Sequence, residues 1–443
     1  MSGGVAMAPA SSGGDAGAAG WSRLQILVVL LCALINALDG MDVMIIAYVA
    51  PALASDWQVG VEALGVLFSA GLVGMMIGCI LVAPFADIWG RRPTILLALV
   101  LMTIGALGCG LVGGLWSFAL MRVVTGVGIG TLLASIAALV SEYAPAGRRS
   151  LAIGIFQAGY PVGAVLTGLV AILSIPTFGW QETMLGAGII SAVLIPVVWI
   201  FLPESVNFLE TRQPAGALER INLLRGKLGR PALPHLAERP AASALPRMGD
   251  LLTQGRWRST LTLWCATFLS FAVLYFITSW IPKLAVERGL DHGDAIWSGS
   301  IFNLGGVAGG LLIGWLAIRR PIGALIGLFF LACAALMILF TASLPLALLL
   351  CVACLLGMTL QGGFSGFYSL AAQVYPTSVR GAGIGWAVGI GRGGAVIGPM
   401  AGGLLLGAKL PLWLVFTCFA VPLCIAGVLA AITLRIGGNI IHD

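Results

Sequence analysis

Two aspartates, Asp39 and Asp42, lie three residues apart inside an apolar stretch that runs from Leu24 to Pro51. An ionised carboxylate in hydrocarbon costs at least about 2.5–3.5 kcal/mol. Residues three apart share one face of a helix, so this face must line a polar cavity or meet a cation. The pair therefore predicts a path for protons, ions or a polar substrate across a bilayer. We expect at least one aspartate to be the proton-coupling group. For the other, the alternative role is hydrogen bonding to helix ends near Gly40.

Two arginines, Arg122 and Arg392, lie in other apolar stretches and balance the two acids in number. Arginine stays protonated at working pH, and its planar fork matches a carboxylate through two parallel hydrogen bonds. An aspartate can gain or lose a proton, depending on its burial and its neighbours. A fixed cation beside a switchable acid is what proton-coupled uptake of an organic anion requires. We therefore predict that both arginines bind substrate, with structural pairing to an aspartate as the alternative for each.

The composition is that of a polytopic membrane protein. Of 443 residues, 59% are hydrophobic and 9% are charged, and the mean hydropathy is +1.05, whereas soluble domains carry about 25% charged residues. A helix that crosses a bilayer needs about 20 apolar residues. Twelve stretches qualify, at residues 24–50, 62–84, 94–113, 116–140, 151–173, 183–202, 260–281, 296–317, 321–343, 345–372, 381–407 and 411–434. We predict an all-α membrane protein with twelve transmembrane helices.

Lysine and arginine residues gather on one side of the predicted membrane, as at residues 91–92, 148–149 and 319–320. The positive-inside rule places this side, and both termini, in the cytoplasm. The net charge of +6 follows from this topology and gives no reason to expect a nucleic-acid partner. The expected parts are a disordered N-terminal tail (1–20), an N-terminal six-helix bundle (21–202), a cytoplasmic central loop (203–258), a C-terminal six-helix bundle (259–435) and a C-terminal tail (436–443).

The two halves of the chain repeat. An offset of 231 residues, the separation of Pro145 from Pro376, also places Arg149 on Arg380. The two bundles are therefore expected to be pseudo-symmetric. Duplicated six-helix halves build alternating access in many transporters, with the site near mid-membrane between the halves.

The connection between the second and third spans reads APFADIWGRRP at residues 83–93. It resembles the G-x-x-x-D-R-x-G-R-[RK] loop of the major facilitator superfamily, with Ala83 and Ile88 replacing the first Gly and the first Arg. Residues 122–128 are similar to that superfamily's R-x-x-x-G-x-G, and residues 202–205 (LPES) are also common there. The charged residues at this side of the membrane predict a cytoplasmic gate, with a solvated loop as the alternative; its candidates are Asp87, Arg91, Arg92, Glu142 and Arg149.

The first span also resembles a narrower family, the aromatic acid:proton symporters, whose first span carries D-G-x-D. Residues 39–42 (DGMD) match it without a gap, and residues 375–394, which contain Arg392, resemble the same family's tenth and eleventh spans. The resemblance implies a monomer in the bacterial inner membrane that imports a hydroxybenzoate-like or benzoate-like acid with protons by alternating access. It also favours contact between Arg392 and the substrate carboxylate.

A site for an aromatic acid needs apolar and aromatic walls with a few polar groups. The candidates in the predicted spans are Gln157, Tyr160, Phe268, Asn303, Phe364, Tyr368 and Trp386, with Phe156, Trp264, Tyr275 and Phe302 as further possibilities. For each of them, packing or lipid contact is the alternative interpretation.

Other functions stay open on the sequence. The same scaffold could carry a non-aromatic anion such as a muconate-like diacid, or act as an efflux antiporter, although Tyr160 rather than glycine precedes Pro161 in the fifth span. A membrane sensor would need an output domain, for which the central loop is short. The sequence contains no H-E-x-x-H, P-loop or nucleophile-elbow motif, so we expect no enzyme activity, no metal and no cofactor other than a proton gradient.

Overall fold

The computed structural model describes residues 21–145, 148–236, 251–253, 256–287, 289–376 and 379–436. Twelve spans in this part of the chain are long and apolar enough to cross a membrane, which confirms the predicted number. The predicted N-terminal tail lies outside the described residues, as do residues 237–250 of the central loop and 437–443 of the C-terminal tail. The spans are α1 (Arg23–Trp57), α2 (Val61–Ile77) with its continuation η1 (Gly78–Val82), η2 (Ala83–Phe85) and α3 (Ala86–Trp89), α4 (Arg91–Leu111), α5 (Leu115–Tyr143), α6 (Arg149–Phe178), α7 (Trp180–Phe201), α11 (Trp257–Glu287), α12 (His292–Leu316), α13 (Ile322–Phe340), α14 (Leu346–Val374), α15 (Arg380–Gly407) and α16 (Leu412–Ile436).

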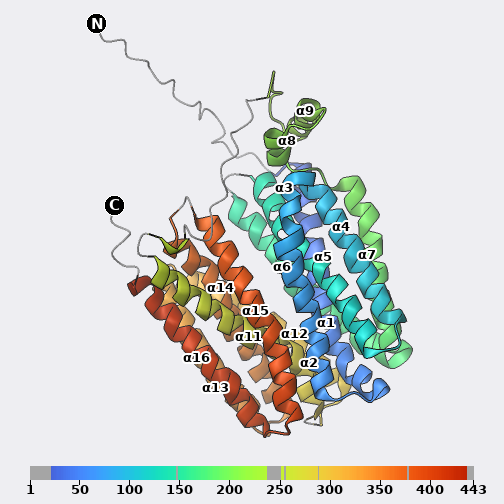
Figure 1. Cartoon of the computed structure of the whole chain (residues 1–443), viewed down its shortest axis with the longest axis vertical. Helices are drawn as coiled ribbons and strands as arrows, with labels where there is room; N and C mark the ends of the chain where they lie inside the picture. Colours follow the sequence, from blue (N-terminus) through green and yellow to red (C-terminus); the bar gives the residue numbers. More distant parts are fainter. Residues whose placement is uncertain are drawn as a thin grey trace.

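The spans form two groups, α1 to α7 and α11 to α16, which are the blue-to-green and the yellow-to-red helices of Figure 1. Between the groups in sequence lie two short helices, α8 (Val206–Arg212) and α9 (Ala217–Lys227), at one end of the molecule. They are held by a small apolar cluster of Leu209, Ile221 and Leu224. We call this end the α8 end. Because successive spans reverse direction, α1, α4, α6, α11 and α15 all begin there.

Helix α1 is the central element, because it carries both predicted acids and is buried along most of its length. It begins with a capping box: the Ser22 side chain accepts a hydrogen bond from the Gln25 backbone, and the Gln25 side chain accepts one from Ser22. It ends where Gln58 turns into the left-handed region at φ 52°. A helix that is apolar on all sides is a buried helix. Asp39 and Asp42 are the acidic exceptions among the buried residues of α1.

Helices α1 and α6 approach each other closely at Gly40. A Cβ atom built at this position would overlap the backbone carbonyl of Tyr160. Small residues allow such backbone contact between membrane helices. The contact fixes the height of Asp39 and Asp42 relative to α6.

We expect Gly40→Ala to destabilise the folded protein, because the two helices must move apart to admit the methyl group. Overpacking of this kind typically costs about 1–3 kcal/mol. Thermal unfolding of the purified protein in detergent measures the effect. The matched control is Gly154→Ala in α6, where a Cβ atom meets open space; equal melting temperatures for the two variants would contradict the predicted close contact.

The two groups of helices touch near the end opposite the α8 end. The Ser69 hydroxyl of α2 donates a 2.7 Å hydrogen bond to the Val396 carbonyl of α15. The hydroxyls of Tyr48 in α1 and Ser300 in α12 lie 3.3 Å apart. The rings of Phe68 and Trp280 meet edge to face, with 5.1 Å between centroids. These contacts join the two halves on the side of Asp39 that is farther from the α8 end.

Candidate substrate and proton site

The two buried acids have different surroundings, and Asp42 forms an ion pair. Arg122 of α5 donates hydrogen bonds through Nη1 to Asp42 Oδ1 and Oδ2, at 3.1 and 3.0 Å, and through Nη2 to the Asp42 backbone carbonyl at 3.3 Å. Both side chains are buried. Breaking a buried pair by removing one partner leaves an uncompensated charge. Asp42 and Arg122 therefore hold each other in a fixed arrangement within the N-terminal half.

Asp39 is the unsatisfied acid. It is 4% exposed, and its Oδ1 atom has no hydrogen-bond partner among the described residues. The charged groups that act on it electrostatically are Arg392 and Asp42. A buried polar atom without a partner is costly, so this oxygen is placed to take up a proton or a ligand.

Arg392 of α15 faces α1 and α2 from the C-terminal half. Its Nη1 atom lies 3.2 Å from the hydroxyl of Tyr275 and 3.7 Å from the sulfur of Met75, and its Cζ atom lies 5.8 Å from the ring centroid of Phe271. The side chain is buried, and Nε has no hydrogen-bond partner among the described residues. A buried guanidinium without a bound carboxylate has donors to spare, which is the arrangement that an anion site requires.

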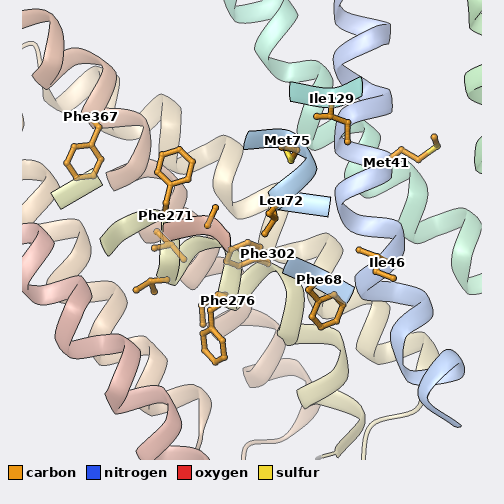
Figure 2. Packing of buried hydrophobic residues seen from close by; sticks show 14 of the residues in the cluster. Met41, Ile46, Phe68, Leu72, Met75, Ile129, Phe271, Phe276, Phe302 and Phe367 are labelled. Atoms are coloured by element: carbon orange, nitrogen blue, oxygen red, sulfur yellow. The ribbon is translucent and has the colours of Figure 1, made fainter. Parts of the chain in front are cut away.

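A small cavity lies beside Arg122 and reaches Tyr275 of the C-terminal half. It is bordered by Arg122 on one side and by Tyr275, the partner of Arg392, and Ser279 on the other. Figure 2 shows several of its apolar lining residues, which are Ile46, Phe68, Leu72, Met75 and Ile129. The cavity thus extends from Arg122, the partner of Asp42, to Tyr275, which contacts Arg392.

A second cavity, on the side of Arg392 nearer the α8 end, is walled mainly by aromatic and aliphatic side chains of α11, α14 and α15. Phe271 and Phe364 meet there edge to face, with 4.6 Å between ring centroids and 81° between planes. Phe367, which Figure 2 shows with Phe271, also lines it. We call it the aromatic cavity. Phe271 thus lines this cavity and also lies beside Arg392.

The structure brings some of the other predicted site residues to this place. Phe364 and Tyr368 line the aromatic cavity. Tyr160 of α6 interacts electrostatically with Asp39, Arg392 and Tyr275, so it lies in the same central cluster. The predicted acids, arginines and these three aromatic residues thus meet from both halves of the chain.

Other predicted residues lie elsewhere. Phe268 is not among the residues that line either cavity, and its ring faces Gly393 instead. Asn303 is buried and donates to the Gly299 carbonyl at 3.0 Å. Gln157 and Trp386 are exposed, and the ring centroid of Trp386 lies 6.3 Å from that of Trp264. None of these four borders the two cavities described above.

The predicted gate residues are partly brought together at the α8 end. Arg91 forms an ion pair with Glu142, and the Ser205 hydroxyl donates to the other Glu142 oxygen at 2.7 Å. Arg92 donates to the backbone carbonyl of Trp199. By contrast, the side chains of Asp87 and Arg149 are exposed. The backbone carbonyl of Asp87 accepts a hydrogen bond from Arg212.

Glu204 was not among the predicted site residues, although it lies in the LPES motif. Its Oε1 atom accepts hydrogen bonds from the backbone N–H groups of Arg91 and Arg92, at 2.9 and 3.1 Å, at the start of α4. Gly90, at φ 108°, sets the turn that brings these groups to the carboxylate. An acid at a helix N-terminus satisfies free N–H groups and the helix dipole. The acid at the start of α4 is thus Glu204, which follows the end of α7 in sequence.

We expect Glu204→Ala to lower stability by about 1–2 kcal/mol, the usual cost of losing a helix N-terminal cap. Glu204→Gln keeps an acceptor oxygen and should lose less. Thermal unfolding in detergent compares them, with Glu210→Ala, an exposed acid of α8, as the matched control. A melting temperature for Glu204→Ala equal to that of Glu210→Ala would contradict the capping role.

Comparison with known proteins places this site in a family. The profile of the Major Facilitator Superfamily matches residues 32–399 and 263–437. The chain is 32% identical over 400 residues to a gallate transporter of Pseudomonas putida, covering 90% of this chain and 89% of that protein. It is 33% identical over 416 residues to the 4-hydroxybenzoate transporter PcaK of Acinetobacter baylyi, covering 92% and 90%. A benzoate transport protein of the same organism is 29% identical over 413 residues, covering 89% and 86%.

Solved structures share the fold. A bacterial homologue of the human lysosomal transporter Spinster superposes with a TM-score of 0.72 at 17% identity, covering 94% of this chain and 98% of that one. A D-xylose-proton symporter gives 0.71 at 16% identity, covering 93% and 97%. Together with the twelve spans, these matches show a multi-pass membrane protein. The chain therefore belongs to the Major Facilitator Superfamily, as a transporter of its aromatic acid transporter family and not an enzyme.

Proposed function

We propose that this protein imports an aromatic carboxylate together with a proton by alternating access. The observation that carries the proposal is Arg392, a buried guanidinium with an unsatisfied Nε beside a cavity walled by Phe271 and Phe364. A carboxylate is complementary to the cation, and an aromatic ring is complementary to the apolar and aromatic side chains beside it. The relatives named for gallate, 4-hydroxybenzoate and benzoate support the same substrate class.

Asp39 is the proposed proton carrier. In the absence of substrate, Arg392 and Asp39 act on each other as opposite charges. An arriving carboxylate replaces Asp39 as the counter-ion of Arg392, which leaves the Asp39 charge uncompensated in a buried site. A proton on Asp39 then restores neutrality. Asp42 does not share this role, because Arg122 already satisfies both of its oxygens.

The route of release follows from the arrangement of the halves. Hydrogen bonds such as Ser69 to Val396 join them near the end opposite α8, while Tyr368, on the α8 side of Arg392, is 44% exposed. Arginines such as Arg91 and Arg92 lie at the α8 end, so the positive-inside rule makes it cytoplasmic. We therefore assign this state to release into the cytoplasm, with Arg91 and Glu142 in the gate. We also propose a monomer that acts in the bacterial inner membrane, for which the bacterial origin of the relatives is the support.

Uptake into energised vesicles tests the proposal. Labelled benzoate, 4-hydroxybenzoate and muconate are offered with an inward proton gradient, with and without a protonophore. We expect accumulation of at least one aromatic acid that the protonophore abolishes. Uptake of muconate without either aromatic acid would overturn the substrate class, and aromatic uptake that ignores the protonophore would overturn proton coupling. Loss of preloaded benzoate from vesicles in exchange for external protons would instead indicate an efflux antiporter.

A further inference from the structure

Arg392 makes its hydrogen bonds through one of its three nitrogen atoms. Its hydrogen bonds to the described residues both start at Nη1, which donates to the hydroxyl of Tyr275 at 3.2 Å and to the sulfur of Met75 at 3.7 Å. Each terminal nitrogen of a guanidinium carries two hydrogens, so both donors of Nη1 are in use. Nε, by contrast, is buried and has no hydrogen-bond partner among the described residues. One part of the cation is thus held in place, while another part is unsatisfied.

The donors that remain on Arg392 form one edge of the guanidinium. The five N–H donors of this group lie in a fixed planar fork. The N–H of Nε and the nearer N–H of Nη2 point the same way, so they can meet the two oxygens of one carboxylate in two parallel hydrogen bonds. Neither of the hydrogen bonds that Arg392 makes to the described residues uses this edge. The Nε–Nη2 edge is therefore the one that a substrate carboxylate can occupy without displacing a partner of the cation.

The two partners of Nη1 belong to different halves of the protein. Tyr275 lies on α11, and Arg392 lies on the neighbouring α15. These two helices are in close backbone contact, because a Cβ atom built at Gly398 would overlap the carbonyl of Ala272. Met75 comes from α2 in the other half, and its thioether is a weak acceptor. Alternating access is largely a rigid-body rocking of one half against the other, so Tyr275 is the partner that moves together with Arg392.

We propose that Tyr275 is a positioning residue, which accepts a hydrogen bond from Nη1 and thereby holds Arg392 in the orientation whose Nε–Nη2 edge binds the substrate carboxylate. The inference rests on the proposed function. An arginine side chain has many rotamers, and ordering it at the moment of binding reduces affinity. A guanidinium that is held beforehand avoids this loss. Without the hydroxyl, the edge is presented for only a fraction of the time, and the apparent affinity falls by that fraction.

Tyr275→Phe is the direct test, because it removes the hydroxyl and keeps the ring, which stacks with that of Phe271 at 6.1 Å between centroids and 6° between planes. A hydrogen bond to a charged group is worth about tenfold or more in affinity. We therefore expect a KM for benzoate uptake about tenfold above that of the wild type, with little change in kcat, since the interaction serves binding. Tyr375→Phe is the matched control: this buried tyrosine follows the last residue of α14, and its substitution should leave the KM at the wild-type value.

A double-mutant cycle with Arg392→Lys distinguishes positioning from direct contact. The lysine ammonium is a point charge without a planar edge, so the hydroxyl has no edge to orient. The dissociation constant of labelled benzoate is measured for the wild type, the two single variants and the double variant, each purified in detergent. We expect the double variant to bind benzoate as Arg392→Lys does. A hydroxyl that contacts the substrate directly, or a tyrosine that matters only for packing, would instead give effects that multiply.

The outcomes also separate this inference from the proposed function. An unchanged KM and dissociation constant in Tyr275→Phe overturn the inference, as do effects that multiply in the cycle, and both results leave proton-coupled aromatic import standing. A wild-type protein that neither binds nor takes up any aromatic acid overturns the proposed function, and the inference with it. If Tyr275→Phe does not reach the membrane, the cycle is run with Tyr275→Leu, which also lacks an acceptor. Effects that do not multiply then support the inference, and effects that multiply overturn it.

Discussion

Replacing Arg392 with glutamine should reduce the rate of aromatic acid uptake at limiting substrate by at least about thirtyfold. The side chain is the buried cation that borders the aromatic cavity through Phe271, and the loss of one partner of a buried charge pair costs about 2–5 kcal/mol. Arg392→Lys keeps the charge but loses the planar fork. It should therefore fall between the wild type and Arg392→Gln. Initial uptake rates over a range of concentrations give kcat/KM for each.

Arg320→Gln is the matched control for this substitution, because Arg320 is exposed in the loop between α12 and α13. It removes the same charge from the chain without touching the site. A fluorescent tag fused to each variant measures the amount of protein in the membrane, and the uptake rates are divided by this amount. An Arg392→Gln variant with the kcat/KM of Arg320→Gln would show that the substrate carboxylate binds elsewhere.

The second large effect is expected on substituting the two acids, because the two variants should lose different properties. Asp39→Asn should lose accumulation driven by a pH gradient while retaining exchange of labelled for unlabelled substrate, because Arg392 and the aromatic cavity remain. Asp42→Asn should instead destabilise the protein by about 3–5 kcal/mol, since Arg122 is left as a buried charge without its partner. Gradient-driven uptake, exchange in de-energised vesicles and thermal unfolding are measured for both variants.

The double substitution Asp42→Asn with Arg122→Gln is the control for the second acid. It removes both charges of the pair and should recover part of the lost stability. Gradient-driven accumulation by Asp39→Asn at the wild-type level would rule out Asp39 as the proton carrier. Loss of exchange in Asp39→Asn, with normal thermal stability, would instead show that Asp39 contacts the substrate directly.

The fold was largely predictable because the bilayer imposes a strong constraint on sequence. Each span needs about 20 apolar residues, so the twelve helices follow from hydropathy. The four charges in the interior of the predicted spans, Asp39, Asp42, Arg122 and Arg392, were also predictable, since charge in an apolar stretch is costly unless it functions. Which acid pairs with which base was not predictable. Asp42 and Arg122 are 80 positions apart in sequence, and their pairing depends on how α1 and α5 pack.

The aromatic wall shows a different limit. Phe268 and Phe271 are equally aromatic and lie on the same span, but Phe271 lines the cavity beside Arg392, whereas Phe268 faces Gly393 on α15. The difference is the rotation of α11, which a helix that is apolar on all sides does not reveal. Glu204 was missed for a similar reason: its partners at Arg91 and Arg92 are more than a hundred residues away in sequence, so the local motif does not reveal the contact.

The difference between the two aspartates has a bioenergetic consequence. With Asp42 held by Arg122, the proposed mechanism leaves Asp39 to carry the proton beside Arg392, so one proton would accompany one monovalent acid. The complex that crosses is then electrically neutral, and the membrane voltage does no work on it. Accumulation is limited by the pH difference alone, at about tenfold, or 1.4 kcal/mol, per pH unit. A cell using this carrier could thus draw in aromatic acids at low external pH even when its membrane is depolarised.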